Sequence, residues 1–556
     1  MKKKNSGESG EQGKNGHLSR RDFMHKVGVT LGAVTMGPLA ASYGAKPGPK
    51  TDNIPLNKGD FMKNLASLSA SNLVKALKKK KISSLELLEF YIERYKRLNP
   101  RINAIVATDF ENARKRARAA DAAFARGEDW GPLHGLPMTI KDNIEVVGMP
   151  TTYGMPLFKN FMPSKNTDVV QSLLNAGAII FGKTNLPLMG MDTQSFNEVY
   201  GQTNNPWDVT RTPGGSSGGA AAALASGLTG LEIGNDIGGS LRIPSHFCGI
   251  YGHKPSYNIV TMHGGDKPWK LLDAKYIHTD YVMDIDLAVN GPLARSAEDL
   301  KLAMDIIVGS PSYQSKAIKI KLPQPRKTSL KEFRVGLWLD DPIFPPDTEV
   351  KNCLQNITDR LAKAGVNLKT KKPDIELKRC HELRNALETM TMSHTQPQQY
   401  FDWAVSQLKT LKDDDHSGMA MWVRAITAYH RDWNRLNYIR AMIRQKWADY
   451  FNEFDVLLCP VVRIPAFPHD HTEIRKRVTR FNDQDMNHWD VVGPWNSLSL
   501  VAYLPATVAP IGFTSKGLPV GIQIVGPYLE DHTPIQFAML LEKEITGSFK
   551  LPPGFE

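Results

Sequence analysis

The sequence predicts an α/β fold with a central sheet, and two observations support this. Short apolar runs of the strand type recur along the chain, and stretches with helical spacing separate them. Regular alternation of the two patterns is typical of layered α/β proteins. The strand-like runs lie at residues 138–140, 178–181, 334–338, 456–458 and 521–525.

Three helices are predicted at the start of the folded region. Residues 61–80 and 83–98 have amphipathic spacing, and the second helix opens with a capping box from Ser83 to Glu86. It is expected to end before Pro100, because proline lacks the N–H that an interior helical position donates. Residues 111–126 form the third, alanine-rich candidate.

The first 45 residues are predicted to be a twin-arginine signal peptide rather than part of the fold. Arg20 and Arg21 lie within the motif Ser19-Arg20-Arg21-Asp22-Phe23-Met24, and a Gly/Ala-rich apolar run follows from Val27 to Ala45. A membrane anchor is the weaker interpretation, because this run is barely long enough, weakly hydrophobic and contains Pro38. We expect a periplasmic protein, delivered by the twin-arginine export machinery, without lipid or membrane attachment.

The charge of the chain argues against nucleic-acid binding, and the spacing of its cysteines argues against a metal site. The chain carries a net charge of +12, of which the leader contributes +4, and no basic–aromatic pattern accompanies it. A solvated basic surface is therefore favoured over nucleic-acid binding. The cysteines have neither metal-ligand nor paired spacing and are predicted to be buried thiols, with Cys353–Cys380 as the candidate if one disulfide forms. They are Cys248, Cys353, Cys380 and Cys459.

Two glycine-rich clusters carry serines about two dozen residues apart. They are Gly214-Gly215-Ser216-Ser217-Gly218-Gly219 and Asp236-Ile237-Gly238-Gly239-Ser240-Leu241-Arg242. Glycine leaves the backbone uncovered and permits positive φ, so N–H groups beside Ser240 can converge on one point and stabilise an oxyanion. We therefore predict that Ser240 is a nucleophile. Its oxyanion hole would be formed by the N–H groups of Ile237, Gly238, Gly239 and Ser240.

A serine nucleophile needs a base at neutral pH, and no histidine lies near either cluster in the sequence. Lys141 follows the apolar run 138–140, at the expected end of a strand. Burial there would lower the pKa of its amine from about 10.4. Lys141 is therefore the candidate base, and an ordinary surface lysine is the alternative interpretation.

Together these residues resemble the amidase signature family. The Gly/Ser-rich signature of that family runs here from Pro213 to Pro255, and the spacing of Lys141, Ser216 and Ser240 is close to that in mammalian fatty acid amide hydrolase. Segments outside the signature also match, at residues 201–207 and 291–296, so the resemblance extends over roughly residues 65–545.

The resemblance implies a fold, a triad and a reaction. The fold is the amidase signature fold, in which helices cover both faces of a central mixed β-sheet, here as a single domain at 61–550 after a linker at 46–60. In the triad Lys141 is the base, Ser216 the bridging serine with a cis peptide bond, and Ser240 the nucleophile. The reaction is hydrolysis of a carboxylic amide to an acid and ammonia or an amine through an acyl-enzyme, without cofactor or metal.

Other residues of the two clusters are expected to support the triad. Ser217, Asp236 and Arg242 would brace the loop of Ser240 by hydrogen bonds and charge pairing rather than react. Asn235 stands where the family usually has threonine, and its polar side chain can still donate or accept a hydrogen bond. The expected partner is a small-molecule amide substrate, and the protein is expected to be a monomer or a homodimer.

Several local patterns invite other interpretations. Residues 177–184 match a phosphate loop, but their middle is strand-like, so the N–H groups would pair within a sheet. The stretches 413–416 and 469–471 lack zinc-ligand spacing and are predicted to be solvated loops, with His469 and His471 as candidates for the rim of a pocket.

The methionines of the second half of the chain are predicted to lie in the core. If they line the pocket instead, an apolar acyl or aryl group would be favoured in the substrate. They are Met390, Met392, Met419 and Met421.

Two further functional hypotheses stay open at this point. The amidase-signature subunit of a tRNA-dependent amidotransferase would work in the cytosol with partner subunits, which the twin-arginine leader argues against. A non-catalytic exported binding protein on the same fold would have no reason to keep Lys141, Ser216 and Ser240 together. The choice among fatty, aryl and peptide amides and lactams is not determined by the sequence.

Overall fold

The computed structural model describes residues 64–268, 285–395, 398–415 and 417–556. All of these residues belong to one compact unit that spans Asn57–Glu556. The predicted signal peptide at 1–45 and the predicted linker at 46–60 lie outside the described residues, as does His416.

The described residues form a large mixed sheet, as the resemblance implies. Strands β9, β10 and β11 run parallel to one another, and the remaining neighbours pair antiparallel. From one edge to the other the strands are β10 (Asn367–Lys369), β9 (Arg334–Leu337), β11 (Val456–Pro460), β15 (Pro519–Val525), β14 (Ala506–Phe513), β7 (Tyr251–Lys254), β8 (Val289–Ala294) and β6 (Glu232–Asp236).

A three-stranded sheet adjoins the large one at β6. Its order is β1 (Ile105–Thr108), β3 (Ile179–Thr184) and β2 (Pro137–Lys141), with β2 parallel and β1 antiparallel to β3. The Thr139 N–H donates to Thr229 Oγ1 at 3.0 Å, which ties β2 to the segment that leads into β6. The smaller hairpins pair β4 (Phe196–Asn197) with β5 (Gly201–Gln202) and β12 (Val478–Phe481) with β13 (Gln484–Asn487).

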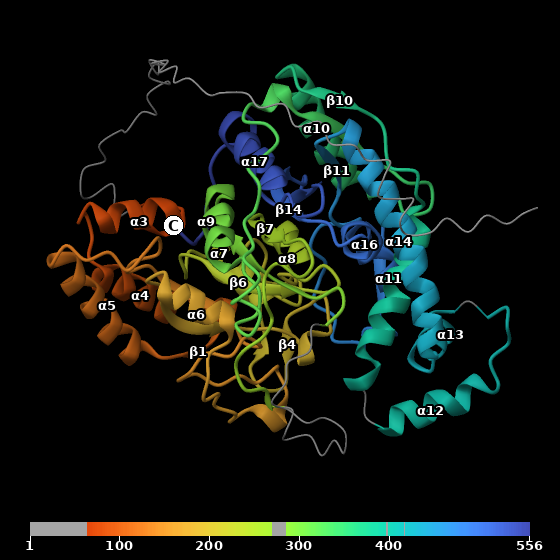
Figure 1. The fold of residues 1–556 in the computed structure, drawn as a ribbon, viewed down its shortest axis with the longest axis horizontal. Helices are drawn as coiled ribbons and strands as arrows, with labels where there is room; N and C mark the ends of the chain where they lie inside the picture. Colours follow the sequence, from red (N-terminus) through yellow and green to blue (C-terminus); the bar gives the residue numbers. More distant parts are fainter. Residues whose placement is uncertain (1–63, 269–284, 396–397, 416) are drawn as a thin grey trace, which may run out of the picture. The chain divides into compact units, whose positions relative to one another are not determined.

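Helices cover both faces of the large sheet (Figure 1). Those of the first half are α3 (Ala70–Lys78), α4 (Ser84–Ile102), α5 (Phe110–Ala125), α6 (Asp168–Asn175), α7 (Gly218–Ala225), α8 (Arg242–Cys248) and α9 (Ala297–Ile307). Those of the second half are α10 (Thr348–Lys363), α11 (Leu377–Met392), α12 (Gln398–Leu408), α13 (Gly418–Ile426), α14 (His430–Glu453), α15 (His488–Val492), α16 (Pro494–Val501) and α17 (His532–Leu541).

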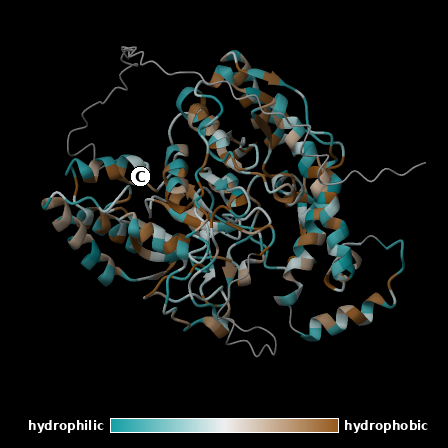
Figure 2. Cartoon of the chain, in the orientation of Figure 1, coloured by the Kyte–Doolittle hydropathy of each residue, from teal (hydrophilic) through white to brown (hydrophobic). Residues whose placement is uncertain are grey.

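Alternate residues of a central strand face opposite sides of the sheet. In β11, Val456 and Leu458 pack into a core that also contains α9, α10 and α17, whereas Leu457 and Cys459 pack into another with α14 and α16. This period of two is the strand geometry expected when both faces are buried. The helices themselves alternate polar and apolar residues, as the mixed colours of α10 and α14 show (Figure 2).

Two of the predicted helices differ from the structure. Helix α3 begins only at Ala70, because Leu68 is extended and the Ser69 hydroxyl caps the helix by accepting from the Asn72 N–H. Helix α4 has the predicted capping box but continues through Pro100 to Ile102. Pro100 lies in the last turn, where little helix follows it, and Asn103 in the left-handed conformation ends the helix.

The structure also tests the predictions for the phosphate-loop pattern and for the cysteines. Within residues 177–184, the stretch from Ile179 onward forms β3 and is paired on both sides, so the phosphate-loop interpretation is excluded as expected. All four cysteines are buried and free, and the candidate pair Cys353–Cys380 is not formed. Its members lie in separate hydrophobic cores.

Candidate active site

The side chain of Lys141 reaches the hydroxyl group of Ser216. Lys141 is the last residue of β2 and Ser216 lies just ahead of α7, and Lys141 Nζ is 2.7 Å from Ser216 Oγ. The Gly215–Ser216 peptide bond is cis, as the resemblance implies. Lys141 is 0% exposed and Ser216 2%. The fold thus brings together two residues of the predicted triad that are 75 positions apart in the chain.

Asn235 holds the lysine from a second direction. Lys141 Nζ donates to Asn235 Oδ1 at 2.7 Å, and Asn235 Nδ2 donates to Asn143 Oδ1 at 2.9 Å. The sequence indicates only that a polar residue at this position can make hydrogen bonds. Asn235 contacts the lysine because β6 lies beside β2. Local sequence patterns do not encode this contact between distant segments.

Burial changes the acid–base behaviour of Lys141. Loss of water around the amine lowers the pKa of Lys141 from 10.5 to about 7, against the opposing effect of the nearby carboxyl groups of Asp236, Glu232 and Asp142. Desolvation disfavours the charged form of an amine, which is the direction that a lysine base requires. Near neutral pH a substantial fraction of Lys141 is therefore able to accept a proton.

Ser240 lies in the turn between β6 and α8. The backbone N–H of Ser217 donates to the Ser240 carbonyl at 3.2 Å, and the Ser217 hydroxyl donates to the Asn235 carbonyl at 3.3 Å. These bonds join the two glycine-rich clusters. Ser240 is 8% exposed and lines a large cavity, whereas Lys141 and Ser216 are not among the residues that line it.

One of the four N–H groups predicted to form the oxyanion hole is not available. The N–H of Gly239 donates to Asp236 Oδ1 at 2.8 Å, so this donor is already used. Gly239 has φ +114°, and a methyl group at its Cα would lie 2.9 Å from Asn496 Cγ, which makes glycine necessary there. The N–H groups of Ile237, Gly238 and Ser240 remain as the candidate donors to an oxyanion.

Asp236 and Arg242 brace the turn that carries Ser240. Arg242 Nε and Nη2 donate to the Asp236 carboxylate at 3.0 Å each, and both side chains are fully buried. Although burial alone would raise the pKa of Asp236, Arg242 holds it below its ordinary value. Arg242 Nη1 also donates to Gln523 Oε1 at 2.7 Å, which fixes the turn to β15. These bonds hold the turn that carries Ser240 against the sheet.

We expect that Arg242→Met destabilises the protein by about 3–5 kcal/mol, because it leaves Asp236 as an unpaired buried charge. Urea unfolding monitored by circular dichroism measures the difference. The matched control is Arg480→Met, whose ion pair with Asp485 is 61% and 65% exposed and should change stability little. Equal stability losses in the two variants would contradict the bracing role of Arg242.

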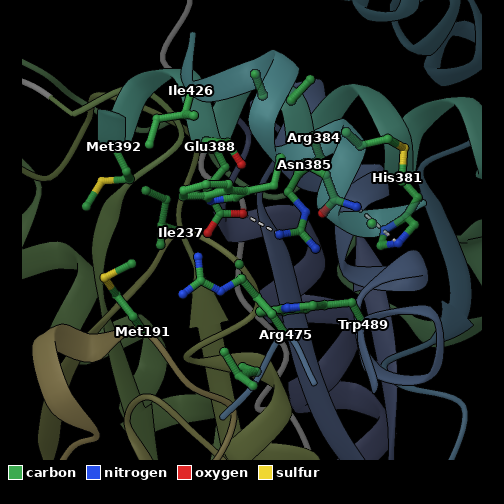
Figure 3. Close-up of a pocket in the computed structure, with 18 of the residues that line it drawn as sticks. Met191, Ile237, His381, Arg384, Asn385, Glu388, Met392, Ile426, Arg475 and Trp489 are labelled. Carbon is green, nitrogen blue, oxygen red and sulfur yellow. Dashed lines mark hydrogen bonds and ion pairs between the residues drawn. The ribbon is translucent and has the colours of Figure 1, made fainter. Parts of the chain in front are cut away.

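A cavity of about 2310 Å³ opens in front of Ser240. Its walls come from residues 187–202, from α11 and α13, and from the loop at 471–475, together with Ile237 and Gly238. Figure 3 shows Met191, Ile237, Met392 and Ile426 on the walls of this space. The volume is large enough for a substrate well beyond the size of a simple amide.

The methionines predicted to lie in the core line this cavity instead. Met390 and Met392 are half-buried on α11, and Met419 and Met421 on α13 are 45% and 40% exposed. The helical spacing of these residues is that of a buried face, but the face borders the cavity. Flexible thioether side chains suit an apolar ligand of irregular shape.

One of the two histidines predicted for the pocket rim lies there. His471 lines the cavity, donates from Nε2 to Gln202 Oε1 at 2.7 Å, and stacks on Phe196 with ring centroids 4.2 Å apart. His469 is half-buried outside the cavity lining.

Among the residues that the structure describes, no helix is both long and apolar enough to cross a membrane.

Comparison with known proteins identifies the family to which the chain belongs. A family profile described as Amidase matches residues 86–534. One subunit of the glutamyl-tRNA(Gln) amidotransferase of Nostoc sp. (strain PCC 7120 / SAG 25.82 / UTEX 2576) is 28% identical over 513 residues, which cover 87% of this chain and 99% of that protein. A crystal structure of an amidase superposes with a TM-score of 0.67 at 26% identity, covering 86% of this chain and 99% of the other.

Fatty acid amide hydrolase shares the fold, with a TM-score of 0.67 at 20% identity over 89% of this chain and 91% of that one. The profile match spans most of the chain and includes the β2 lysine, both glycine-rich clusters and the turn that Asp236 and Arg242 brace. This protein therefore belongs to the Amidase family.

Proposed function

We propose that this protein hydrolyses a carboxylic amide to an acid and ammonia or an amine, with Ser240 as the nucleophile. The contact of 2.7 Å between Lys141 Nζ and Ser216 Oγ carries the proposal, since it joins a buried amine to a serine beside the Ser240 turn. Membership of a family of amide hydrolases supports the same reaction.

The proposed mechanism begins with neutral Lys141. Lys141 Nζ takes the hydroxyl proton of Ser216 while Ser216 Oγ takes that of Ser240, and the Ser240 oxygen attacks the amide carbonyl carbon. The N–H groups at Ile237, Gly238 and Ser240 stabilise the oxyanion. Asn235 Oδ1 occupies one N–H of the lysine and so helps to orient its lone pair towards Ser216.

Collapse of the tetrahedral intermediate breaks the C–N bond. The proton held by Lys141 passes through Ser216 to the leaving nitrogen, which departs as ammonia or an amine, and the acyl group stays on Ser240. Water then loses a proton along the same relay, attacks the ester carbonyl and releases the acid. Each cycle returns Lys141, Ser216 and Ser240 to their starting protonation states.

The lining of the cavity supports an apolar acyl or aryl group in the substrate. Met191, Met392 and Ile426 border the space in front of Ser240, and Trp422 and Trp489 contribute aromatic surface. A panel of primary amides, which release ammonia on hydrolysis, tests this with ammonia as the readout. We expect higher kcat/KM for aryl and medium-chain amides than for acetamide, and a uniform absence of ammonia release would contradict the proposed activity.

The second candidate is an amidotransferase-type role, which the 28% identity to the Nostoc amidotransferase protein over most of the chain favours. A protein in that role would hydrolyse glutamine to supply ammonia to a partner. Glutamine included in the same panel separates the two: a strong preference for glutamine, and the need for added partner proteins, would favour the amidotransferase role. We favour the stand-alone hydrolase because of the leader.

We further propose that the protein is exported to the periplasm by the twin-arginine route, on the basis of Arg20 and Arg21 and the apolar run after them. Replacing both arginines with lysine keeps the positive charge but removes the recognised pair. The double variant is expected to stay in the cytoplasm, unprocessed and active. Fractionation followed by immunoblotting measures this. Processing near Ala45 as efficient as in the wild type would contradict the twin-arginine route.

A further inference from the structure

A carboxylate lies directly over the turn that carries Ser240. Glu388 projects from α11 into the cavity, and a methyl group added at the Gly238 Cα would lie 3.4 Å from Glu388 Oε1. Figure 3 shows Glu388 pointing into the space beside Ile237. No step of the proposed hydrolysis uses this group, although it adjoins a candidate oxyanion donor.

A buried arginine fixes the position of this carboxylate. Arg384, one helical turn before Glu388, bonds Oε2 through Nη1, and its side chain is 2% exposed against 23% for Glu388. Arg384 is held in turn by Ser497 Oγ, at 3.4 Å from Nε, and by the ring of Trp489, 5.4 Å from its guanidinium carbon. The pair is therefore preorganised, and although both residues line the cavity, Glu388 is the more exposed of the two.

One oxygen of Glu388 is left to accept a hydrogen bond. Its Oε2 is bonded to Arg384, whereas Oε1 makes no hydrogen bond within the part of the chain that the structure describes. The neighbouring cation Arg475 is engaged elsewhere, with Nε 2.8 Å from Glu473 Oε1 and its guanidinium carbon 5.0 Å from the Trp422 ring. The surrounding wall also presents apolar side chains, with Ile237, Met392 and Ile426 among them.

We propose that Glu388 Oε1 accepts a hydrogen bond from an N–H group of the substrate placed next to the scissile carbonyl, so that the preferred substrates are amides with an amino substituent there, such as amino-acid amides. The inference rests on the proposed amide hydrolysis. An amide without that donor would cover the carboxylate with apolar atoms and leave it without a partner, which disfavours binding. The apolar wall would hold the side chain of the same substrate.

The test compares two amides that differ only in this group, phenylalaninamide and 3-phenylpropanamide, at about pH 7, where an α-amine is mostly protonated. In the wild type we expect kcat/KM to be about tenfold higher for phenylalaninamide, as for a charge-assisted hydrogen bond. Glu388→Gln is expected to bring the ratio close to one. Glutamine keeps an acceptor for Arg384 and the volume of the side chain, so it limits structural damage.

The matched control is Glu453→Gln, the same change at an exposed helical residue outside the cavity lining, whose carboxylate lies 2.7 Å from Lys371 Nζ. It should keep the wild-type ratio. An unchanged ratio in Glu388→Gln, or a wild type that favours 3-phenylpropanamide, would overturn the inference. A purely structural role of Glu388 would lower both rates equally and leave the ratio in place, which also counts against it.

Binding separates this inference from the proposed activity. In the Ser240→Ala background, calorimetry should give a lower Kd for phenylalaninamide than for 3-phenylpropanamide, and Glu388→Gln should remove the difference. If wild-type protein releases ammonia from neither amide while this difference in Kd persists, the activity is wrong and the recognition of the amine stands. Equal Kd values for the two amides would refute the recognition itself.

Discussion

Replacing Ser240 with alanine is expected to lower amide turnover by at least about 10⁴-fold while leaving the protein folded. The change removes the attacking oxygen. The turn around it should persist, because the N–H groups of Gly239 and Leu241 donate to the Asp236 carboxylate and the Ser217 N–H donates to the carbonyl of residue 240. Ammonia release under saturating substrate measures the loss, and circular dichroism with thermal unfolding reports whether the fold is intact.

Ser226→Ala is the matched control for this prediction. Ser226 is a fully buried serine at the end of α7, and its hydroxyl donates to the carbonyl of Ala222 one turn earlier, at 2.6 Å. This variant should retain nearly full activity. Retention of more than about a tenth of wild-type turnover in Ser240→Ala would remove Ser240 from its assigned role, since no other side chain could replace a lost nucleophile to that extent.

The second large effect concerns Lys141 and pH. We expect kcat/KM to rise with pH through an apparent pKa of about 7, the value to which burial lowers the pKa of Lys141. Only the neutral amine accepts the Ser216 proton, so each pH unit below that value should lower kcat/KM about tenfold, and the profile should level above it. Lys141→Ala should reduce kcat/KM by about 10²–10⁴-fold, and a chelator should change nothing.

Another buried lysine provides the control for the pH profile. Burial also lowers the pKa of Lys254 to about 7, but its Nζ donates to the Pro255 carbonyl at 2.7 Å rather than to a serine hydroxyl. Lys254→Met should therefore keep the wild-type midpoint. A midpoint that disappears in this variant would assign the titration to Lys254 instead. Activity lost to a chelator and restored by zinc would contradict a lysine base altogether.

Much of the site could be predicted because its chemistry is concentrated in short motifs. The glycine-rich clusters placed Ser216 and Ser240, and the apolar run before Lys141 placed a buried amine, which the structure shows 2.7 Å from Ser216. The α/β class followed from alternating strand and helix patterns, and the mixed sheet agrees with it. The order of the strands came from no local pattern, because it depends on contacts between distant segments.

The features that the sequence did not predict depend on such contacts. The N–H of Gly239 is taken by Asp236 Oδ1 because the turn folds back on its own strand end. The α13 residues Met419 and Met421 have the spacing of a core face, and only the position of α13 beside the cavity places them at a substrate surface. Glu388 carried no sequence signal, since a Glu four residues after an Arg is common on exposed helices.

The most direct test is to identify the residue that reacts as the nucleophile. The purified protein would be incubated with an activated phosphonate, a reagent that reacts covalently with activated serines, and then digested and analysed by mass spectrometry. We predict a single adduct on Ser240, absent in Ser240→Ala and formed much more slowly in Lys141→Ala. An adduct on another residue, or undiminished labelling in Lys141→Ala, would contradict a Ser240 nucleophile activated through Ser216 and Lys141.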